Sequence, residues 1–317
     1  MARPPARLLG PGLADLIMLS YTIAGQATLP YVPLYAQHLG LTPRAIGLLM
    51  SLPGLGAACA SLVAGAWLAR FGPRRLLVSA SVIAFGSLVA VWLWTSAGAF
   101  VAFMPLFWTV QPLVAVASQV LVVARGTTVG HDRAVAAHSV YMSFGASLGP
   151  LLGSTVVAMT GRLASVFPAA AAMAAVAAAI ARAAPAQPSA ETTSGLPLGA
   201  SLRAAPAIAR TAMLAVLVAE FCYVAWGTFY PLALKSAGVA PGAIGVVFAV
   251  YGLAISLGRT AMSWGVARIG RLGVLIAAFA LMTAGLWLSV MPGTGAVPYV
   301  AAVLLGLGGL AFPITIV

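Results

Sequence analysis

The chain has 317 residues, of which 62% are hydrophobic and only 6% are charged, and its mean hydropathy is +1.07. A soluble domain carries roughly a quarter charged residues, so the composition excludes a soluble globular protein and predicts an integral membrane protein. The formal net charge of +12 does not predict nucleic-acid binding, because the basic residues are scattered between apolar stretches and form no cluster on one soluble face.

Apolar stretches long enough to cross a bilayer, about 20 residues each, follow one another along the chain. None alternates as the strands of a membrane β-barrel do, so the predicted fold class is an all-α membrane protein. We place ten spans at residues 12–36, 45–69, 76–95, 99–124, 134–159, 163–182, 206–234, 243–267, 273–291 and 296–317.

A block of the second half repeats a block of the first half at a constant offset (231 − 33 = 198 and 270 − 72 = 198). A gap-free match across two spans and their loops predicts two like-oriented helical bundles, related by an axis along the membrane normal. The repeated positions are Pro33, Gly40, Pro43, Ile46, Gly47, Gly54, Arg70 and Gly72, followed by Pro231, Gly238, Pro241, Ile244, Gly245, Gly252, Arg268 and Gly270.

The repeat divides the chain into an N-terminal bundle over residues 1–182 with spans 1–6, a linker over 183–205, and a C-terminal bundle over 206–317 with spans 7–10. The linker is rich in Pro, Ala, Ser and Thr, a composition typical of flexible connections. If the second bundle copies the first, two further spans follow. We therefore expect ten of twelve spans to be present and the sequence to be truncated in the tenth.

The basic residues fall unequally on the two sides of the predicted spans, twelve against three. Positive residues favour cytoplasmic loops, so the bias predicts a cytoplasmic N-terminus, a cytoplasmic linker and a multi-pass protein of the cell membrane. The twelve are Arg3, Arg7, Arg70, Arg74, Arg75, Arg125, Arg133, Arg182, Arg203, Arg210, Arg268 and Arg271, and the three are Arg44, Arg162 and Lys235.

Two equivalent loops carry glycine and arginine. The loop after the second span begins at Gly65 and reads GAWLARFGPRR, and the loop after the eighth begins at Ala267 and reads ARIGR. A glycine turn lets two helices hinge tightly, and the arginines either interact with helix C-termini or simply follow the positive-inside bias. The residues that we single out are Gly65, Arg70, Gly72, Arg74, Arg75, Arg268, Gly270 and Arg271.

The fifth span contains glycines at Gly145, Gly149 and Gly153, which share one helix face and allow close helix contact. Pro150 removes a backbone hydrogen bond and bends the span. A generic packing face of small residues explains the glycines alone, whereas their combination with proline is more specific. In the first span, prolines at Pro30 and Pro33 predict a further bend.

These motifs resemble those of the major facilitator superfamily, and the resemblance covers essentially the whole chain. The first loop is similar to the family's G-x-x-x-D-R-x-G-R-R, with Ala69 in place of the aspartate, and the second loop lacks that aspartate too. The fifth span resembles the antiporter motif G-x-x-x-G-P-x-x-G-G, with Ser154 at its last glycine. Pro30 to Pro33 is similar to the P-x-x-P of twelve-span drug–proton antiporters. The resemblance implies gate loops at the cytoplasmic side and proton-driven efflux.

Ionisable groups inside spans are costly unless paired, and they often mark functional sites. Glu220 lies about 14 residues into its span, roughly 20 Å deep, and is the leading proton-coupling candidate. Arg259, roughly 12 Å from its cytoplasmic end, either pairs with Glu220 or snorkels to the surface. Asp15 is a further candidate, although a carboxylate about one turn into a helix also favours the helix N-terminus.

Other polar and aromatic residues within the spans are candidates to line a substrate cavity, each with ordinary packing as the alternative. They are Tyr21, Gln26, Gln111, Gln119, His138, Tyr141, Tyr223 and Trp226. No motif has the spacing of a metal site, and none implies a cofactor.

The sequence therefore predicts a secondary transporter that works by alternating access, with proton-coupled efflux of a small, apolar or cationic molecule. The expected partners are this substrate, protons and the lipid bilayer, and the expected assembly is a monomer. The alternatives are a symporter that imports a metabolite and, more distantly, a membrane sensor or scaffold that transports nothing. An enzyme is not expected, because no nucleophile, base or metal-ligand cluster is present in the sequence.

Overall fold

The computed structural model describes residues 12–123, 131–184, 207–291 and 293–309, and every regular element in these ranges is a helix. The predicted all-α fold is thus confirmed for the described part of the chain. Apart from its first two residues, the linker expected over 183–205 lies outside the described residues.

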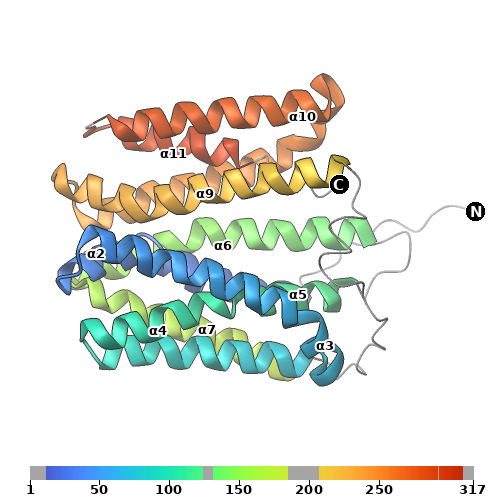
Figure 1. Cartoon of the computed structure of the whole chain (residues 1–317), viewed down its shortest axis with the longest axis horizontal. Helices are drawn as coiled ribbons and strands as arrows, with labels where there is room; N and C mark the ends of the chain where they lie inside the picture. Colours follow the sequence, from blue (N-terminus) through green and yellow to red (C-terminus); the bar gives the residue numbers. More distant parts are fainter. Residues whose placement is uncertain (1–11, 124–130, 185–206, 292, 310–317) are drawn as a thin grey trace, which may run out of the picture.

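The helices lie side by side along the long axis of the molecule (Figure 1). Those of the first half are α1 (Leu13–Thr28), α2 (Tyr31–His38), α3 (Pro43–Leu93), α4 (Ala97–Thr109), α5 (Gln111–Val123), α6 (His131–Thr160), the short 3₁₀ turn η1 (Leu163–Ser165) and α7 (Val166–Ala183). Those of the second half are α9 (Ala207–Ser236), α10 (Pro241–Val290) and α11 (Val297–Gly308).

Eight helical stretches of the described chain are long and apolar enough to cross a membrane. The predicted first span is divided between α1 and α2, of 16 and 8 residues. The described part of the predicted tenth span is α11, an apolar helix of 12 residues. With these two additions, the structure accounts for the ten predicted spans.

The repeat seen in the sequence extends to the backbone conformation. Gly40 and Gly238 both have φ +84°, and Gly72 and Gly270 have φ +74° and +72°. Both pairs are 198 residues apart (238 − 40 = 198 and 270 − 72 = 198), and only glycine adopts such angles without strain. Gly72 interrupts α3 and Gly270 interrupts α10 at the turns between two spans, and both turns lie at the same end of the molecule (Figure 1).

Equivalent residues of the two halves meet where the end of α1 and α2 lie beside α9. Lys235 Nζ donates a hydrogen bond to Gln37 Oε1 at 3.0 Å, and these residues are 198 apart. A Cβ built on Gly227 would lie 3.8 Å from Leu29 Cδ1, again a pair at the same offset (227 − 29 = 198). Equivalent residues of two related units meet close to the axis that relates them, so this contact lies at the axis of the repeat.

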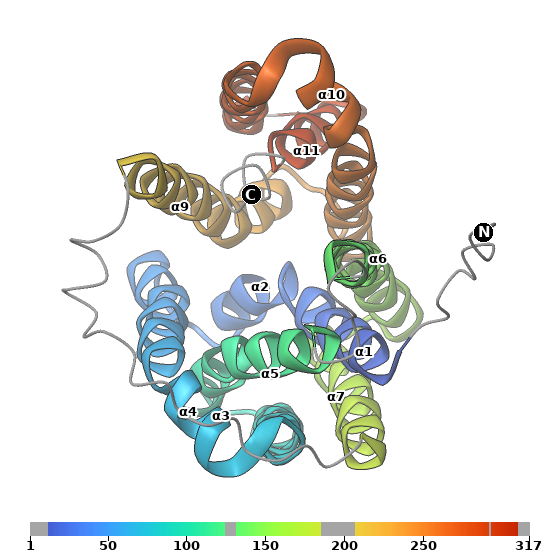
Figure 2. The same cartoon turned by 90° about the vertical axis from the view of Figure 1, so that its right-hand side faces the viewer.

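Viewed along the helices, α1 to α7 gather on one side and α9 to α11 on the other (Figure 2). Helix α6 packs against α1 on one side and α10 on the other, and α9 contacts α2 and α3. The two bundles therefore meet along two seams, one between α6 and α10 and one between α9 and α2.

The glycines of the fifth span account for the close packing of α6 on α1. A Cβ built on Gly145 would lie 2.6 Å from Thr22 Cβ, and one on Gly149 would lie 2.8 Å from the Ile23 carbonyl oxygen. One on Gly153 would lie 2.5 Å from the carbonyl oxygen of Ala27. All three glycines thus lie on the face of α6 that packs against α1, where any larger residue would push the helices apart.

The seam between α6 and α10 also depends on glycine. A Cβ on Gly252 would collide with the carbonyl oxygen of Ala146 on α6. Farther along the seam, Ser154 Oγ donates to the Gly242 carbonyl at 2.7 Å. Small residues and hydroxyls hold the bundles together along this seam.

Candidate functional site

An aromatic cluster lies where α9 faces α10. The rings of Tyr223 and Tyr251 stack with centroids 5.4 Å apart and an interplanar angle of 14°. The centroid of the Trp226 ring lies 5.1 Å from that of Tyr251 and 4.5 Å from that of Phe248. Each such pair contributes about 0.5–1.5 kcal/mol beyond simple burial, so stacking stabilises the cluster.

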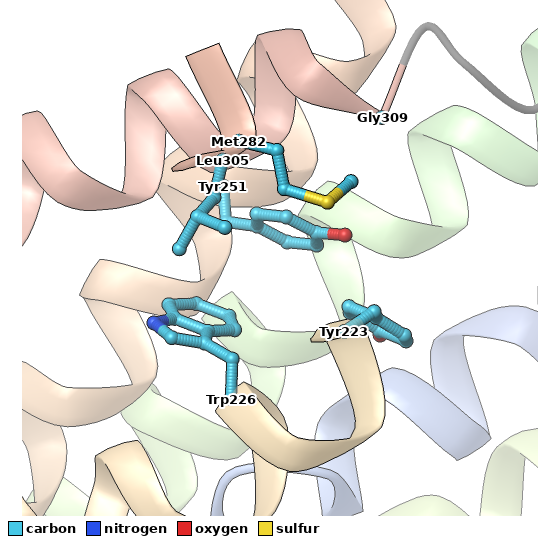
Figure 3. A pocket seen from close by; sticks show the side chains of 6 residues that line it. All are labelled: Tyr223, Trp226, Tyr251, Met282, Leu305 and Gly309. Atoms are coloured by element: carbon cyan, nitrogen blue, oxygen red, sulfur yellow. The ribbon is translucent and has the colours of Figure 1, made fainter. Parts of the chain in front are cut away.

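This cluster forms one side of a small pocket whose cavity volume is about 10 Å³, room for roughly one water molecule in this conformation. Figure 3 shows the Tyr251 ring between the side chains of Trp226 and Met282. The lining is apolar and aromatic, which is typical of small-molecule sites. The lining residues are Tyr223, Trp226, Tyr251, Met282, Leu305 and Gly309.

Two polar contacts fix the orientation of the aromatic side chains. Trp226 Nε1 donates to Ser289 Oγ at 3.0 Å. The Tyr223 hydroxyl donates to Gln26 Oε1 at 3.5 Å, at the limit of a hydrogen bond. Because Gln26 belongs to α1, the second contact joins the pocket of one bundle to the other bundle. Of the predicted cavity residues, Gln26, Tyr223 and Trp226 are thus brought together.

Glu220 lies near the middle of α9, three residues before the pocket residue Tyr223 and therefore on the same helix face. The side chain is exposed, and among the described residues none forms a hydrogen bond or ion pair with it. A carboxyl in this position is accessible to bind a proton or a substrate.

Arg259 does not pair with Glu220 in this structure. Its Nη1 donates to Ser143 Oγ at 2.8 Å and to the Ser139 carbonyl at 3.4 Å, both on α6. Arg259 lies eight residues beyond the pocket residue Tyr251, or roughly 12 Å along α10, and α6 provides its partners there. The arginine therefore belongs to the seam between the bundles.

Asp15 and His138, which the sequence did not connect, form a buried pair. His138 Nδ1 donates to Asp15 Oδ1 at 2.9 Å, and the two side chains are 3% and 12% exposed. The other carboxylate oxygen accepts the backbone N–H of Gly12 at 2.9 Å, which supports the predicted role at the helix N-terminus. His138 Nε2 also lies 3.4 Å from Ser118 Oγ on α5. The pair thus ties α1, α5 and α6 together.

Replacing Asp15 with alanine is expected to destabilise the protein by about 3 kcal/mol, since it leaves a buried histidine without its partner and a helix without its cap. The apparent Tm in detergent should fall by several degrees. Ser81→Ala is the matched control, because the Ser81 hydroxyl is buried without a hydrogen-bond partner and its loss should cost little. An Asp15→Ala variant as stable as the control would show that the pair is not structural.

The remaining predicted cavity residues lie away from the pocket. Tyr21 is buried inside the first bundle, with its hydroxyl bonded to the Phe107 carbonyl at 3.0 Å. Gln111 begins α5, Gln119 is exposed farther along that helix, and Tyr141 is half-buried on α6. None of these four contributes to the pocket lining.

An arginine of each predicted gate loop lies against an aromatic ring. The Arg70 guanidinium lies 5.3 Å from the centre of the Phe71 ring, and that of Arg268 lies 5.5 Å from the Trp264 ring. Such cation–π contacts contribute about 0.5–1 kcal/mol at exposed sites. The two repeat-related arginines are therefore each held against an aromatic ring of their own helix.

Sequence reasoning missed Tyr251, Met282 and Leu305, which line the pocket, and Ser143, which holds Arg259. One signal was available for Tyr251. Aromatic residues spaced three to four apart on α9 mark a single face, and Phe248 and Tyr251 have the same spacing on the next helix. Met282 and Leu305 are ordinary apolar residues of membrane helices and carry no such signal.

The sequence matches the family described as Major Facilitator Superfamily over residues 15–317. The chain belongs to the major facilitator superfamily. It is therefore a multi-pass membrane transporter and not an enzyme. No curated protein sequence matches the chain.

Solved structures of transporters share the fold at low sequence identity. A point mutant of the nucleoside transporter NupG has a TM-score of 0.75 and 14% identity, and the match covers 96% of this chain and 81% of the NupG chain. A bacterial homolog of the human lysosomal transporter Spinster, in an inward-facing and occupied conformation, has a TM-score of 0.72 and 14% identity. The match covers 98% of this chain and 73% of that homolog. A D-xylose–proton symporter has a TM-score of 0.68 and 17% identity, and the match covers 95% of this chain and 78% of the symporter. At such identities the likeness shows the fold alone.

Proposed function

We propose that this superfamily member is a proton-coupled transporter that exports a small molecule by alternating access, as a monomer in the cell membrane. The observation that carries the proposal is the position of the pocket. Its aromatic wall belongs to the second bundle, its Tyr223 contacts Gln26 of the first bundle, and Glu220 lies one helical turn before Tyr223 near the middle of α9. A substrate and a proton would therefore bind where movement of the bundles affects both.

The contacts between the bundles support alternating access. At the end of the molecule that carries Gln37 and Lys235, the bundles are joined by the bond between these residues, by the bond from the Tyr31 hydroxyl to the Pro241 carbonyl at 3.3 Å, and by the bond from Ser154 Oγ to the Gly242 carbonyl at 2.7 Å. Their rupture would open that end, as the rocking of two repeats requires.

Export is favoured by the run from Gly145 to Gly153, which resembles the antiporter motif and packs directly on α1. Import is the second candidate, because one structural neighbour is named as a D-xylose–proton symporter and another as a nucleoside transporter. The direction in which protons move relative to substrate distinguishes the two candidates.

The test uses the purified chain in liposomes that contain a pH-sensitive dye. Uridine, D-xylose and ethidium are added outside, one at a time, beside liposomes without protein. An antiporter exchanges incoming substrate for outgoing protons, so the lumen becomes alkaline, whereas a symporter makes it acidic. Alkalinisation by any of these compounds supports the export mechanism, acidification supports import, and movement of labelled compound without a pH change rejects proton coupling.

The orientation of the protein is a separate prediction that follows from the charge bias. A reporter fused at Ser189 should be found in the cytoplasm and one fused at Gly238 outside, because twelve basic residues lie on the side of the first and three on the side of the second. A fusion at Gly161 should agree with the one at Gly238. Reporters at Ser189 and Gly238 on the same side of the membrane would rule out the proposed topology.

A further inference from the structure

Arg259 is a charged group within a span that the proposed transport mechanism does not use. It lies three residues before the end of the candidate span Pro241–Met262 and eleven residues before the turn at Gly270. A charged side chain inside a span is costly unless it is paired, and it commonly marks a substrate pathway. Its partners in the described structure are a serine hydroxyl and a backbone carbonyl of α6, neither of which carries a charge.

The donors of Arg259 are only partly satisfied. A guanidinium has five N–H donors, and only Nη1 has acceptors, on Ser143 and Ser139. The Nε atom is buried and has no hydrogen-bond partner. No described residue accepts a bond from Nη2. The edge formed by Nε and Nη2, which binds a carboxylate through two parallel hydrogen bonds, is thus unoccupied by any described side chain.

The acids of the described chain do not neutralise this charge. Asp15 is committed to His138 and to the N-terminus of α1. In the described structure no ion pair joins Glu220 to Arg259. The remaining acids of the sequence, Asp132 and Glu191, lie where the structure describes no side chain. The described residues therefore leave a positive charge in the seam between the bundles.

The aromatic pocket lies within reach of this charge. Tyr251, which forms the centre of the pocket wall, is two turns from Arg259 along α10. Tyr251 makes no hydrogen bond to another described residue. A ligand with an apolar or aromatic body against Tyr223, Trp226 and Tyr251 would therefore place a polar end near Arg259 if it extended by roughly 10 Å along the helix.

We propose that Arg259 is the binding site for the acidic group of the substrate, and that the substrate is an organic anion with an aromatic or apolar body and a carboxylate. This inference rests on the proposed transport function and names its substrate class. The carboxylate would take the Nε–Nη2 edge while Ser143 holds Nη1, so the serine positions the guanidinium and the anion neutralises it. The expectation of an apolar or cationic substrate, made from the sequence, is replaced by that of an anion.

The test measures binding to the purified chain in detergent, through the increase in apparent Tm. The probes are benzoate, phenylacetate, 3-phenylpropionate and 4-phenylbutyrate, each beside its neutral amide, and benzyltrimethylammonium as the cation. At least one carboxylate should stabilise the protein in a saturable manner while its amide and the cation do not. Stabilisation by the amide or the cation as strong as by the carboxylate, or by none of the probes, would overturn the assignment of an anion site.

Three variants locate the site. Arg259→Gln should weaken binding of the best carboxylate roughly 10–100-fold, because it removes charged hydrogen bonds. Arg259→Lys keeps the positive charge but lacks the two parallel N–H donors of the guanidinium, so binding of the carboxylate should weaken less than in Arg259→Gln. Arg162→Gln, an exposed arginine in the loop before η1, is the control and should bind as the wild type does. If Arg259→Gln does not fold, Arg259→Lys provides the test. Binding of the carboxylate by this variant with wild-type affinity would overturn the assignment of the carboxylate to the Nε–Nη2 edge.

The liposome test of the proposed function remains independent of this result. Proton-coupled movement of uridine, D-xylose or ethidium, without any binding of carboxylates, would leave the transport mechanism intact and reject only the anion site. Saturable, Arg259-dependent binding of a carboxylate that is not transported would support the site and reject the transport mechanism.

Discussion

Replacing Glu220 with glutamine is expected to abolish the response of transport to a pH gradient while leaving the protein folded and in the membrane. Glutamine has nearly the same volume and shape, but an amide cannot bind and release a proton in the physiological range. Glu220 makes no hydrogen bond or ion pair with another described residue, and its side chain is exposed. Its replacement should therefore cost little stability, so that any loss of transport reports on its charge.

The measurement is uptake into inverted membrane vesicles with an imposed pH gradient, for wild type and Glu220→Gln side by side. Gradient-driven uptake should fall at least tenfold in the variant, whereas exchange of labelled for unlabelled substrate, which needs no net proton movement, should persist. Glu220→Asp is the matched control, because it retains an acid on the same face of α9 and should keep part of the coupling. An unchanged response to the gradient in Glu220→Gln would exclude this carboxyl as the coupling group.

The architecture was predictable because it follows from local and repeated features. Apolar length alone places membrane spans, and the glycines at 72 and 270 mark the turns at which α3 and α10 reverse, since their positive φ excludes most other residues. The offset of 198 residues predicted two like-oriented halves. The structure confirms this with equal angles at equivalent glycines and with the bond between Gln37 and Lys235, which lies at the axis.

The breaks within spans were less predictable. The span predicted over 99–124 is divided into α4 and α5 at Val110. Pro112 explains the break, because it has no N–H to donate to the carbonyl one turn earlier. A proline in a membrane helix is often accommodated by a bend alone, so the sequence indicates distortion at such a position but does not decide between a bend and a new helix.

The candidate site was predictable only where one helix carries it. Glu220, Tyr223 and Trp226 share a face of α9, and their spacing is visible in the sequence. Contacts between distant helices were not visible. Asp15 meets His138 across 123 residues, and Arg259 meets Ser143 across 116. Both pairings depend on how α6 packs against α1 and α10, which is set by tertiary contacts and not by local pattern.

The substitution Gly149→Leu is expected to abolish transport without preventing membrane insertion. A Cβ at this position would lie 2.6 Å from Gln26 Cβ, 2.8 Å from the Ile23 carbonyl oxygen and 2.9 Å from the Ala27 nitrogen. Two of these neighbours are backbone atoms that no side-chain rotation can move. The helices α1 and α6 must therefore separate, at a cost of about 1–3 kcal/mol for overpacking.

The separation would reach the substrate pocket directly. Gln26, which the new side chain would displace, accepts the hydrogen bond from Tyr223 on the opposite bundle. Movement of α6 would also change the other seam, where Gly252 packs on the Ala146 carbonyl. One leucine would thus disturb both contacts that the bundles must form and break in each cycle, whereas insertion depends on the apolar character of the span, which leucine increases.

The matched control for this prediction is Gly86→Leu in α3, where a Cβ would meet no atom within 4 Å. Both variants should reach the membrane in similar amounts, and the control should transport at the wild-type rate. Gly149→Ala adds only the Cβ and should lie between the wild type and the leucine variant. Transport by Gly149→Leu at the rate of the control would mean that α1 and α6 can move apart without consequence, and the glycine run would then be an ordinary packing face with no part in the transport cycle.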